Sequence, residues 1–499
     1  MRNSRFAKNF YQKTIVLLTS AITYPAAQFR LAKHGRVFGP SAREPGSPEL
    51  HALQCDIFRR QTRYQRPAIR NAVSIDALIG DYIRQYNQHK LSFPPVSAGT
   101  SLPAPVAGRR YLLYLHIPFC VVLCPFCSFH RVQFEPRSAK NYFDCLRREI
   151  SLVAESGYRF DELYVGGGTP TVDPDELART IEFVRENHSI TGISVETNPD
   201  DLAKDSMTAL CDVGVNRLSV GVQSFDDELL REMLRFEKYG SGEEISKRLQ
   251  RAEGHFDTLN VDMIFNMPHQ TEESLRRDLK ILTDEVGVDQ VSFYPLMTVN
   301  STRKKMQQSM GSVDYDREKE YYEIIASHML ASGYVRTSAW CFSRKPGLFD
   351  EYIVEREEYL GLGSGSFSYL AGKLYSSTFS INHYLRLVQA GKTGTFGCLD
   401  MTERDQMRYY LLMQLFSGSL DKAAAEERFD GRFQRTLWPE LTMLQAIGAV
   451  RNAGVQLALT EKGYYIWVML MRNFFTGVNN LRDQMRHNIS RETTILGPG

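Results

Sequence analysis

Residues 114–127 have the sequence Tyr-Leu-His-Ile-Pro-Phe-Cys-Val-Val-Leu-Cys-Pro-Phe-Cys, which places Cys120, Cys124 and Cys127 in the spacing C-x-x-x-C-x-x-C. This spacing supplies three thiolates, whereas a structural zinc ion or a four-iron cluster held entirely by protein needs four ligands. The three cysteines therefore leave one coordination position of a bound metal open.

We interpret the three cysteines as ligands of a [4Fe-4S] cluster whose fourth iron binds the amino and carboxylate groups of S-adenosylmethionine (SAM). An electron passed from such a cluster to the sulfonium breaks a carbon–sulfur bond and releases a 5'-deoxyadenosyl radical. The cofactor then supplies the chemistry, and the protein positions and shields it. For the cysteines alone, the alternative is a zinc site with three cysteines and one histidine, His116 or His130.

The sequence around the cysteines predicts an α/β fold with a parallel sheet. Residues 110–117 are short, apolar and aromatic, as in a buried parallel strand, so the cysteines follow its carboxyl end. Similar segments lie at 162–165, 193–196, 217–222, 259–265 and 290–294, and helix-like stretches separate them at 140–155, 174–186, 202–213 and 272–284. Six strands alternating with helices predict a partial (β/α)6 barrel.

Residues suited to ligand binding follow these predicted strands. They are His116, Gly167, Glu196, Gln223, Asp262 and Pro295. Any one of them is explained by a turn or a helix cap. Because the sites of such barrels lie at the carboxyl ends of the strands, we expect the whole set to converge with the cysteines at one mouth.

Four motifs, in this order, resemble those of the radical SAM enzymes related to oxygen-independent coproporphyrinogen dehydrogenase. They are Tyr-x-His-Ile-Pro-Phe-Cys-x-x-x-Cys-x-Phe-Cys at 114–127, Gly-Gly-Gly-Thr-Pro-Thr at 166–171, Glu-x-Asn-Pro at 196–199 and Gly-Val-Gln-Ser-Phe at 221–225. The resemblance is specific from Tyr111 to about residue 300 and weaker to about residue 470. It implies a radical SAM barrel followed by a small helical, winged-helix-like C-terminal domain.

The resemblance also implies roles for individual residues, with Cys120, Cys124 and Cys127 as the cluster ligands. The residues implied to contact the cluster-bound SAM are Tyr114, Gly167, Glu196 and Phe367. A second SAM would contact Phe126, Gly168, Thr169, Gln223, Arg235, Asp262 and Leu296. Acidic groups suit ribose hydroxyls or the SAM ammonium, and a guanidinium suits a carboxylate. We expect Arg235 and Asp262 to share catalysis with the cysteines.

Three activities are open within this family: oxidative decarboxylation of coproporphyrinogen, heme trafficking without turnover, and radical methylation and opening of heme with iron release, which makes anaerobilin. The decarboxylase pattern Arg-Tyr-Thr-Ser-Tyr-Pro-Thr and its further cysteine are replaced here by Leu-Ser-Phe-Pro-Pro at 91–95 and Ser-Phe-His at 128–130. The chaperone pattern His-Asn-x-x-Tyr-Trp is replaced by Asn-His-Tyr-Leu at 382–385.

Three segments, 235–239, 292–297 and 474–486, resemble the heme-utilisation subgroup and favour the third activity. A heme substrate needs cations for its propionates and a ligand for its iron. Candidate cations are Arg303, Lys304, Lys305 and Arg344, and candidate axial ligands are His130, His269, His383 and Tyr384.

The composition agrees with a multidomain enzyme. The 499 residues carry a formal net charge of +2, so nothing in the charge requires nucleic acid as a partner. Residues 1–70 hold 13 Lys or Arg against 3 Asp or Glu, which leaves −8 for the rest of the chain. This basic leader is expected to be disordered, or to dock an acidic electron donor such as flavodoxin.

Apart from the three clustered cysteines, the other five of the eight stand singly, at 55, 145, 211, 341 and 398, and do not form a disulfide framework, which favours the cytoplasm. The apolar run at 14–22 follows basic residues and resembles a secretory or transit signal, but it is too short to span a membrane. We therefore expect a nonessential extension or a start codon chosen too far upstream. The predicted domains are the leader at 1–60, a helical segment and linker at 61–109 with a helix at 74–88, the barrel at 110–375 and a helical cap at 376–499.

Overall fold

The computed structural model describes residues 101–298, 302–345, 357–487 and 489. Every element below belongs to the unit Ile79–Gly499. The basic leader and the helix expected at 74–88 lie outside the described residues.

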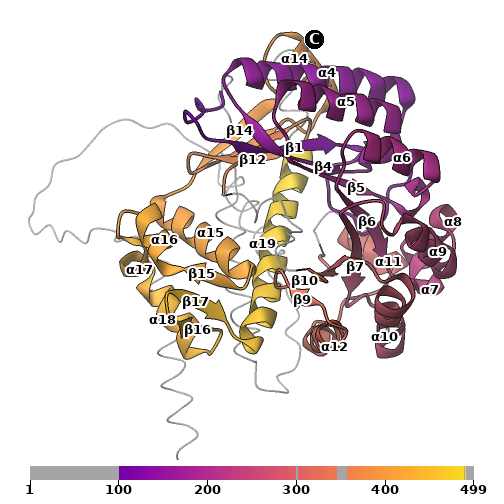
Figure 1. The fold of residues 1–499 in the computed structure, drawn as a ribbon, viewed down its shortest axis with the longest axis vertical. Coiled ribbons are helices and arrows are strands. Elements are labelled where there is room, and N and C mark those ends of the chain that lie inside the picture. Colours follow the sequence, from indigo (N-terminus) through magenta and orange to yellow (C-terminus); the bar gives the residue numbers. More distant parts are fainter. Residues whose placement is uncertain (1–100, 299–301, 346–356, 488, 490–499) are drawn as a thin grey trace, which may run out of the picture. The chain divides into compact units, whose positions relative to one another are not determined.

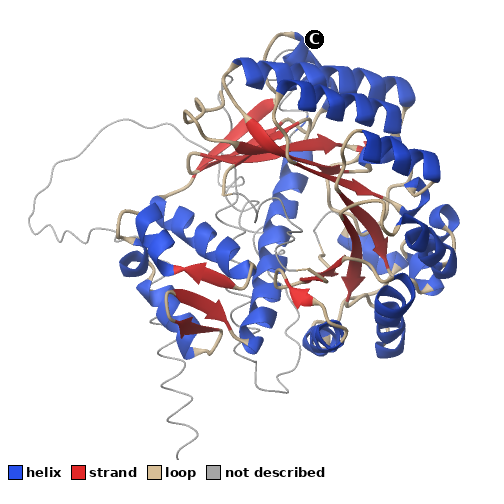
Figure 2. Ribbon diagram, in the orientation of Figure 1, coloured by secondary structure: helices blue, strands red, loops and turns tan. Residues whose placement is uncertain are grey.

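Six parallel strands form the centre of the main sheet and follow one another in chain order (Figures 1 and 2). They are β1 Tyr111–Ile117, β4 Phe160–Gly167, β5 Gly192–Thr197, β6 Arg217–Gln223, β7 Thr258–Phe265 and β8 Gln290–Pro295. Each lies close to its predicted position, because strands buried on both faces are near-continuous apolar runs. All residues of β1 are buried. The predicted partial barrel is confirmed.

Helices connect these strands and cover the outer face of the curved sheet (Figure 1). The longer ones are α4 Pro136–Glu155, α5 Pro174–Asn187, α6 Lys204–Asp212, α9 Gly242–Ala252, α10 Glu272–Lys280 and α12 Glu318–Ala331, and the shorter ones are α7 Asp227–Glu232, α8 Phe236–Tyr239 and α11 Arg303–Ser309. The first helix begins earlier than the expected residue 140. The Glu135 side chain accepts hydrogen bonds from the backbone N–H of Arg137 and Ser138, and Pro136 suits the first turn.

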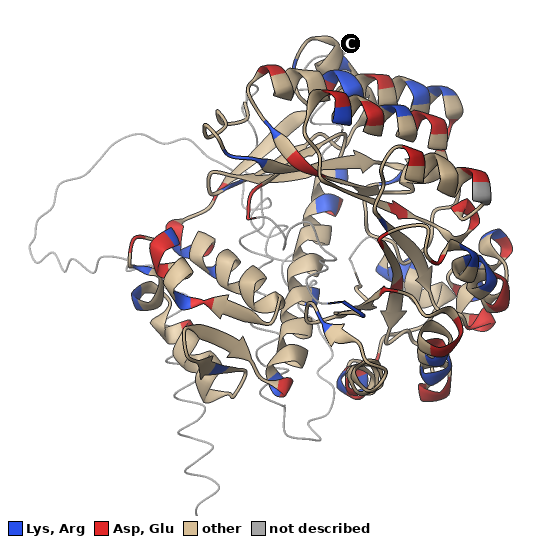
Figure 3. Ribbon diagram, viewed as in Figure 1, with Lys and Arg blue, Asp and Glu red and all other residues tan. Residues whose placement is uncertain are grey.

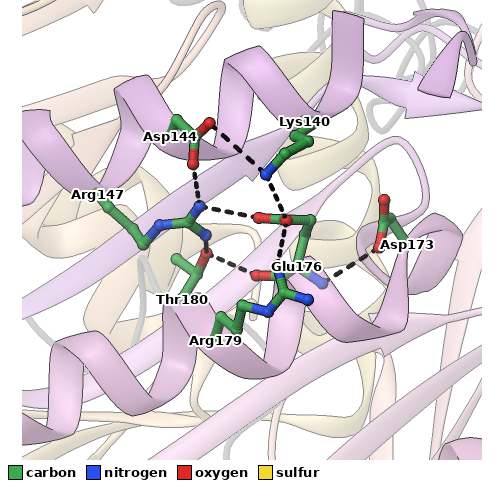
Figure 4. Close-up of polar contacts among 7 residues, drawn as sticks. All are labelled: Lys140, Asp144, Arg147, Asp173, Glu176, Arg179 and Thr180. Atoms are coloured by element: carbon green, nitrogen blue, oxygen red, sulfur yellow. Dashed lines mark hydrogen bonds and ion pairs between the residues drawn. The ribbon is translucent and has the colours of Figure 1, made fainter. Parts of the chain in front are cut away.

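Lys, Arg, Asp and Glu gather on these outer helices (Figure 3). A polar cluster around Glu176 joins α4 to α5 (Figure 4). The Glu176 carboxylate, 4% exposed, pairs with Arg147 at 2.8 Å, Arg179 at 2.7 Å and Lys140 at 3.4 Å. The cluster links the first two helices that cover the sheet.

Further strands extend the sheet beyond both edges of the six, to twelve strands in total among the described residues. On one side, β11 Tyr359–Leu362 pairs parallel with β1, followed by the antiparallel strands β12 Phe367–Leu370, β13 Lys373–Ser377 and β14 Thr395–Asp400. On the other side lie β10 Cys341–Ser343 and β9 Val335–Arg336. The domain boundary expected at residue 375 falls inside β13.

The C-terminal region is largely helical, as predicted, and also contains a small three-stranded sheet. Its elements are α14 Ile381–Gln389, α15 Glu403–Phe416, β15 Ser419–Asp421, α16 Lys422–Arg428, α17 Phe433–Thr436, α18 Trp438–Ala446, β16 Val450–Ala453, β17 Gln456–Leu459 and α19 Glu461–His487. The small sheet has the order β15-β17-β16.

Helix α19 runs along the inner side of the curved sheet (Figure 1). Near its start, the Trp467 indole donates to the Leu412 carbonyl at 2.9 Å, and the Tyr465 hydroxyl donates to Glu318 at 3.3 Å. Near its end, Arg486 donates to the carbonyl of Ser128 at 2.9 Å. This helix therefore ties the C-terminal region to the loop that carries the cysteines.

Among the described residues, no helix combines the length and the apolar character that crossing a bilayer requires.

Candidate active site

A cavity of about 260 Å³ lies at the carboxyl ends of the parallel strands, and α19 contributes to its wall. It brings together all of the site residues predicted from the sequence except one. They are Tyr114, Cys120, Cys124, Phe126, Cys127, Gly167, Gly168, Thr169, Glu196, Gln223, Arg235, Asp262 and Leu296.

Phe367 is the exception, because it is not part of the cavity lining. It lies on β12 in a small apolar cluster with Phe379, Leu481 and Met485. Its ring faces the guanidinium of Arg482, which does line the cavity, at 5.6 Å. The structure thus places Phe367 behind a lining residue.

The cysteine loop is held in shape by the strand that follows it. Strand β2, Phe119–Cys120, pairs parallel with β3, Val132–Gln133. The Arg131 guanidinium donates to the carbonyls of Cys124 at 2.6 Å and Cys127 at 2.9 Å. These bonds use backbone oxygens and leave the thiols available as ligands.

Glycines after β4 allow a turn to pack against this loop. Gly167 has φ +122°, and a Cβ on Gly168 would meet the Phe119 carbonyl oxygen at 2.7 Å and the Cys120 sulfur at 3.0 Å. The amides of Gly168 and Thr169 donate to Ile117 and Phe119 at 2.7 and 2.8 Å. The close approach thus requires glycine at 168.

The surroundings of the thiols do not favour the zinc alternative. Both ring nitrogens of His116 are engaged, with the Tyr114 hydroxyl and the His130 carbonyl, each at 2.9 Å. His130 packs on Phe379 and contacts the Ser364 hydroxyl at 3.3 Å. Neither histidine lines the cavity.

Three thiols on one loop fit a cluster better than a single ion, because the irons of a cubane are bound at separate corners. Burial raises the pKa of the Cys120 thiol to about 11, so ligation has to displace its proton. The hydroxyl of Thr169 donates to this sulfur at 3.5 Å.

Glu196 forms one acidic group of the cavity. It accepts hydrogen bonds from the Tyr164 hydroxyl at 3.0 Å and from the amide of Gly167 at 3.1 Å. A Cβ on Gly166 would lie 2.7 Å from this carboxylate. Burial raises the pKa of Glu196.

Asp262 forms the second acidic group. It accepts from the Ser219 hydroxyl at 2.9 Å and from the Asn260 amide at 2.8 Å. Burial, with a smaller contribution from the charge of Glu196, raises the pKa of Asp262 to about 7. Two carboxyl groups in one cavity thus favour binding of a cation.

Arg235 joins the cysteine loop to the ends of the strands. Its guanidinium donates to the Cys124 sulfur at 3.7 Å, to the Asn198 side chain at 3.3 Å and to the carbonyl of Gly221. It also lies 4.3 Å from the ring centre of Tyr239. Arg235 is 4% exposed, and its Nε atom has no hydrogen-bond partner.

Sequence reasoning missed several residues that line the cavity. They are Val122, Tyr164, Asn198, Tyr239, Ile264, Tyr294, Phe475, Asn479 and Arg482. Asn198 lies in the Glu-x-Asn-Pro motif and was within reach of the sequence argument. Five of them, Tyr239, Tyr294, Phe475, Asn479 and Arg482, lie in the segments that resemble the heme-utilisation subgroup, but the resemblance gave them no role. The last three lie on α19, and no local pattern indicates that this helix lies beside the barrel.

The candidate cations and axial ligands for heme do not line the cavity. Arg344 contacts the Tyr334 hydroxyl at 3.2 Å, and Arg303, Lys304 and Lys305 are exposed on α11. Tyr384 donates to Glu149 at 2.7 Å, His269 pairs with Glu232 at 2.5 Å, and His383 contacts Thr378 at 3.2 Å. His130 does not line the cavity either. None of these eight residues therefore faces the cavity, and their contacts with heme stay predictions.

Residues 114–282 match the family model of the Radical SAM superfamily. The matched residues, which include the cysteine loop and most of the barrel, are therefore a radical SAM domain, and enzymes of this superfamily use a [4Fe-4S] cluster and SAM. Within this class, the heme chaperone HemW of Lactococcus lactis is 27% identical over 361 residues, which are 70% of this chain and 93% of the relative. The anaerobilin synthase of Escherichia coli is 27% identical over 375 residues, 72% and 82% respectively.

The solved structure of the radical SAM enzyme coproporphyrinogen III oxidase (HemN) from Escherichia coli has the same fold. It superposes with a TM-score of 0.62 at 24% identity and covers 78% of this chain and 93% of that one.

Proposed function

We propose that this protein is a radical SAM methyltransferase that opens the heme macrocycle without oxygen and releases its iron. The observation that carries the proposal is one cavity that contains the three thiols, a second polar set around Arg235 and Asp262, and an apolar wall. The similarity to anaerobilin synthase supports this activity. HemW is similar to the same degree, so the choice between them depends on the experiment below.

In this proposal, Cys120, Cys124 and Cys127 hold the cluster. SAM bound to the cluster supplies a 5'-deoxyadenosyl radical when it is reductively cleaved. Glu196, fixed by two hydrogen bonds, accepts the ribose hydroxyls or the ammonium of this SAM, and Tyr114 and Gly167 complete its site. Phe367 supports the site from behind.

The second polar set is proposed to bind a second SAM as the methyl source. Asp262 and Gln223 face its polar groups, and Arg235 exchanges its contacts with protein oxygens for the methionyl carboxylate. The second SAM is also proposed to contact Phe126, Gly168, Thr169 and Leu296, which line the cavity. A sulfonium cation near Asp262 favours the ionised carboxylate and so releases its proton.

An apolar rim suits a flat macrocycle. The cysteine loop exposes Val121, Leu123 and Phe129 to 47%, 40% and 42%, and Phe129 also lines the cavity. Ile264 and Met297 add apolar surface inside. Exposed apolar side chains on a loop that also lines a cavity favour binding of an apolar ligand.

The test is anaerobic incubation of the reconstituted protein with heme, methyl-labelled SAM and a chemical reductant. We expect loss of the heme absorption bands, release of iron, and a product mass that includes the labelled methyl group. The variant Cys120→Ala should give none of these and serves as the control.

Two results would overturn the proposal. Tight heme binding without any change in its spectrum would indicate a chaperone, and release of carbon dioxide from coproporphyrinogen would indicate a decarboxylase. Replacing the chemical reductant with flavodoxin, using the full chain and a chain without residues 1–70, tests the predicted role of the basic leader.

A further inference from the structure

Arg482 is a buried guanidinium on the wall of the cavity that the proposed roles leave unused. It is 7% exposed and comes from α19, far from the barrel in sequence. Its Nη1 atom donates to the Asn479 side chain at 2.6 Å, and its Nε atom is buried without a hydrogen-bond partner. The guanidinium lies 4.9 Å from the ring centre of Phe129.

The other arginines of this helix have acidic partners. Arg472 pairs with Glu318, and Arg486 lies 3.3 Å from Asp483. Within the described part of the chain, no carboxylate forms an ion pair with Arg482. Glu196 lines the same cavity, but its carboxylate interacts with the charge of Arg482 only at longer range.

An unpaired buried charge is costly, and arginine cannot relieve the cost by losing its proton. The site is therefore suited to an anion that enters the cavity from outside. The hydrogen bond to Asn479 fixes one end of the guanidinium, so its remaining N–H donors are already oriented before the anion binds.

The neighbours of Arg482 indicate what carries the anion. Phe129 and Phe475 line the cavity with it, so the anionic group has to belong to a largely apolar body. A planar carboxylate fits the fork of a guanidinium. We infer that Arg482 binds a peripheral carboxylate of the macrocycle and so selects substrates that carry one. This inference rests on the proposed function.

The test is equilibrium binding to the full-length reconstituted protein, without reductant, so that no turnover occurs. Heme and its dimethyl ester are titrated into the wild type and into the variants Arg482→Met and Arg482→Lys. Arg344→Met is the matched control, because Arg344 is an arginine outside the cavity. Thermal unfolding of each variant shows whether α19 remains folded.

We expect Arg482→Met to weaken heme binding roughly 10- to 100-fold, the usual effect of losing hydrogen bonds to a charged group. Binding of the ester should not change, Arg482→Lys should weaken heme binding less, and Arg344→Met should match the wild type. The ester separates the carboxylate contact from general damage, because a misfolded variant loses both ligands.

Equal heme binding by the wild type and Arg482→Met would overturn the inference and leave the proposed function intact. The inference would also be overturned, with the proposed function intact, if Arg482→Met lost affinity for heme and for the ester equally. A loss of affinity for SAM in place of heme would have the same meaning. A wild type that binds no heme overturns both.

Discussion

Replacing Asp262 with asparagine should change how the stability of the apo-protein depends on pH. Burial raises the pKa of Asp262 from the ordinary 3.8 to about 7, so the folded state holds this proton more tightly than the unfolded chain does. Stability is therefore lost as pH rises from about 4 to about 7. At 1.36 kcal/mol per pKa unit, the loss is about 4 kcal/mol when complete.

Asparagine mimics the protonated side chain and does not titrate. The free energy of unfolding of Asp262→Asn, relative to wild type, should therefore rise by about 2 to 3 kcal/mol between pH 5 and pH 8. A constant offset of about 1 kcal/mol from an altered hydrogen bond to Ser219 or Asn260 does not affect this difference. Urea unfolding of the apo-protein across this pH range measures it.

Asp278 provides a matched control. Burial raises its pKa to about 7 as well, but it accepts from Ser224 and the amide of Phe225, away from the cavity. Asp278→Asn should change the dependence of stability on pH in the same way as Asp262→Asn. Only Asp262→Asn, however, should abolish the release of a proton when SAM binds, which calorimetry in two buffers measures. Parallel stability profiles for wild type and Asp262→Asn would refute the reasoning.

Three further substitutions test the cysteine site and the scaffold. Cys120→Ala should prevent cluster assembly, and iron analysis together with 5'-deoxyadenosine production checks this; retained production would contradict the assignment. Gly168→Ala should lower iron incorporation several-fold, because its Cβ would lie 2.7 Å from a backbone oxygen of β2, whereas Gly192→Ala has only a 3.8 Å contact and should behave as wild type. Glu176→Ala should destabilise the fold by about 1 to 3 kcal/mol, because it removes the buried carboxylate that joins α4 to α5, while Lys140→Ala, which removes an exposed partner, should cost less than about 1 kcal/mol in a urea titration. Equal costs for the two variants would show that the buried carboxylate does not stabilise the helix pair.

Local patterns were sufficient to predict the barrel strands and the residues at their ends. A buried parallel strand is a short apolar run, and its carboxyl end faces the site, so Glu196, Gln223 and Asp262 could be placed in one cavity before any contact was known. The early start of α4 follows from Pro136, since proline favours the first turn of a helix.

Long-range placement was not predictable in the same way. Strand β11 pairs with β1 although about 240 residues separate them, and no periodicity specifies such a partner. For the same reason Arg344 was chosen as a heme contact and Arg482 was not. Both are arginines in mixed sequence, and only the packing of α19 shows which one faces the cavity.

Arg482 and Arg486 lie four residues apart on α19, and one lines the cavity while the other contacts the cysteine loop. Residues four apart lie on one face of a helix, so the face that brings Arg486 to the carbonyl of Ser128 also brings Arg482 into the cavity. Ser128 directly follows the last cysteine. Helix α19 therefore contacts both the loop that carries the thiols and the place where we infer that the carboxylate of the macrocycle binds.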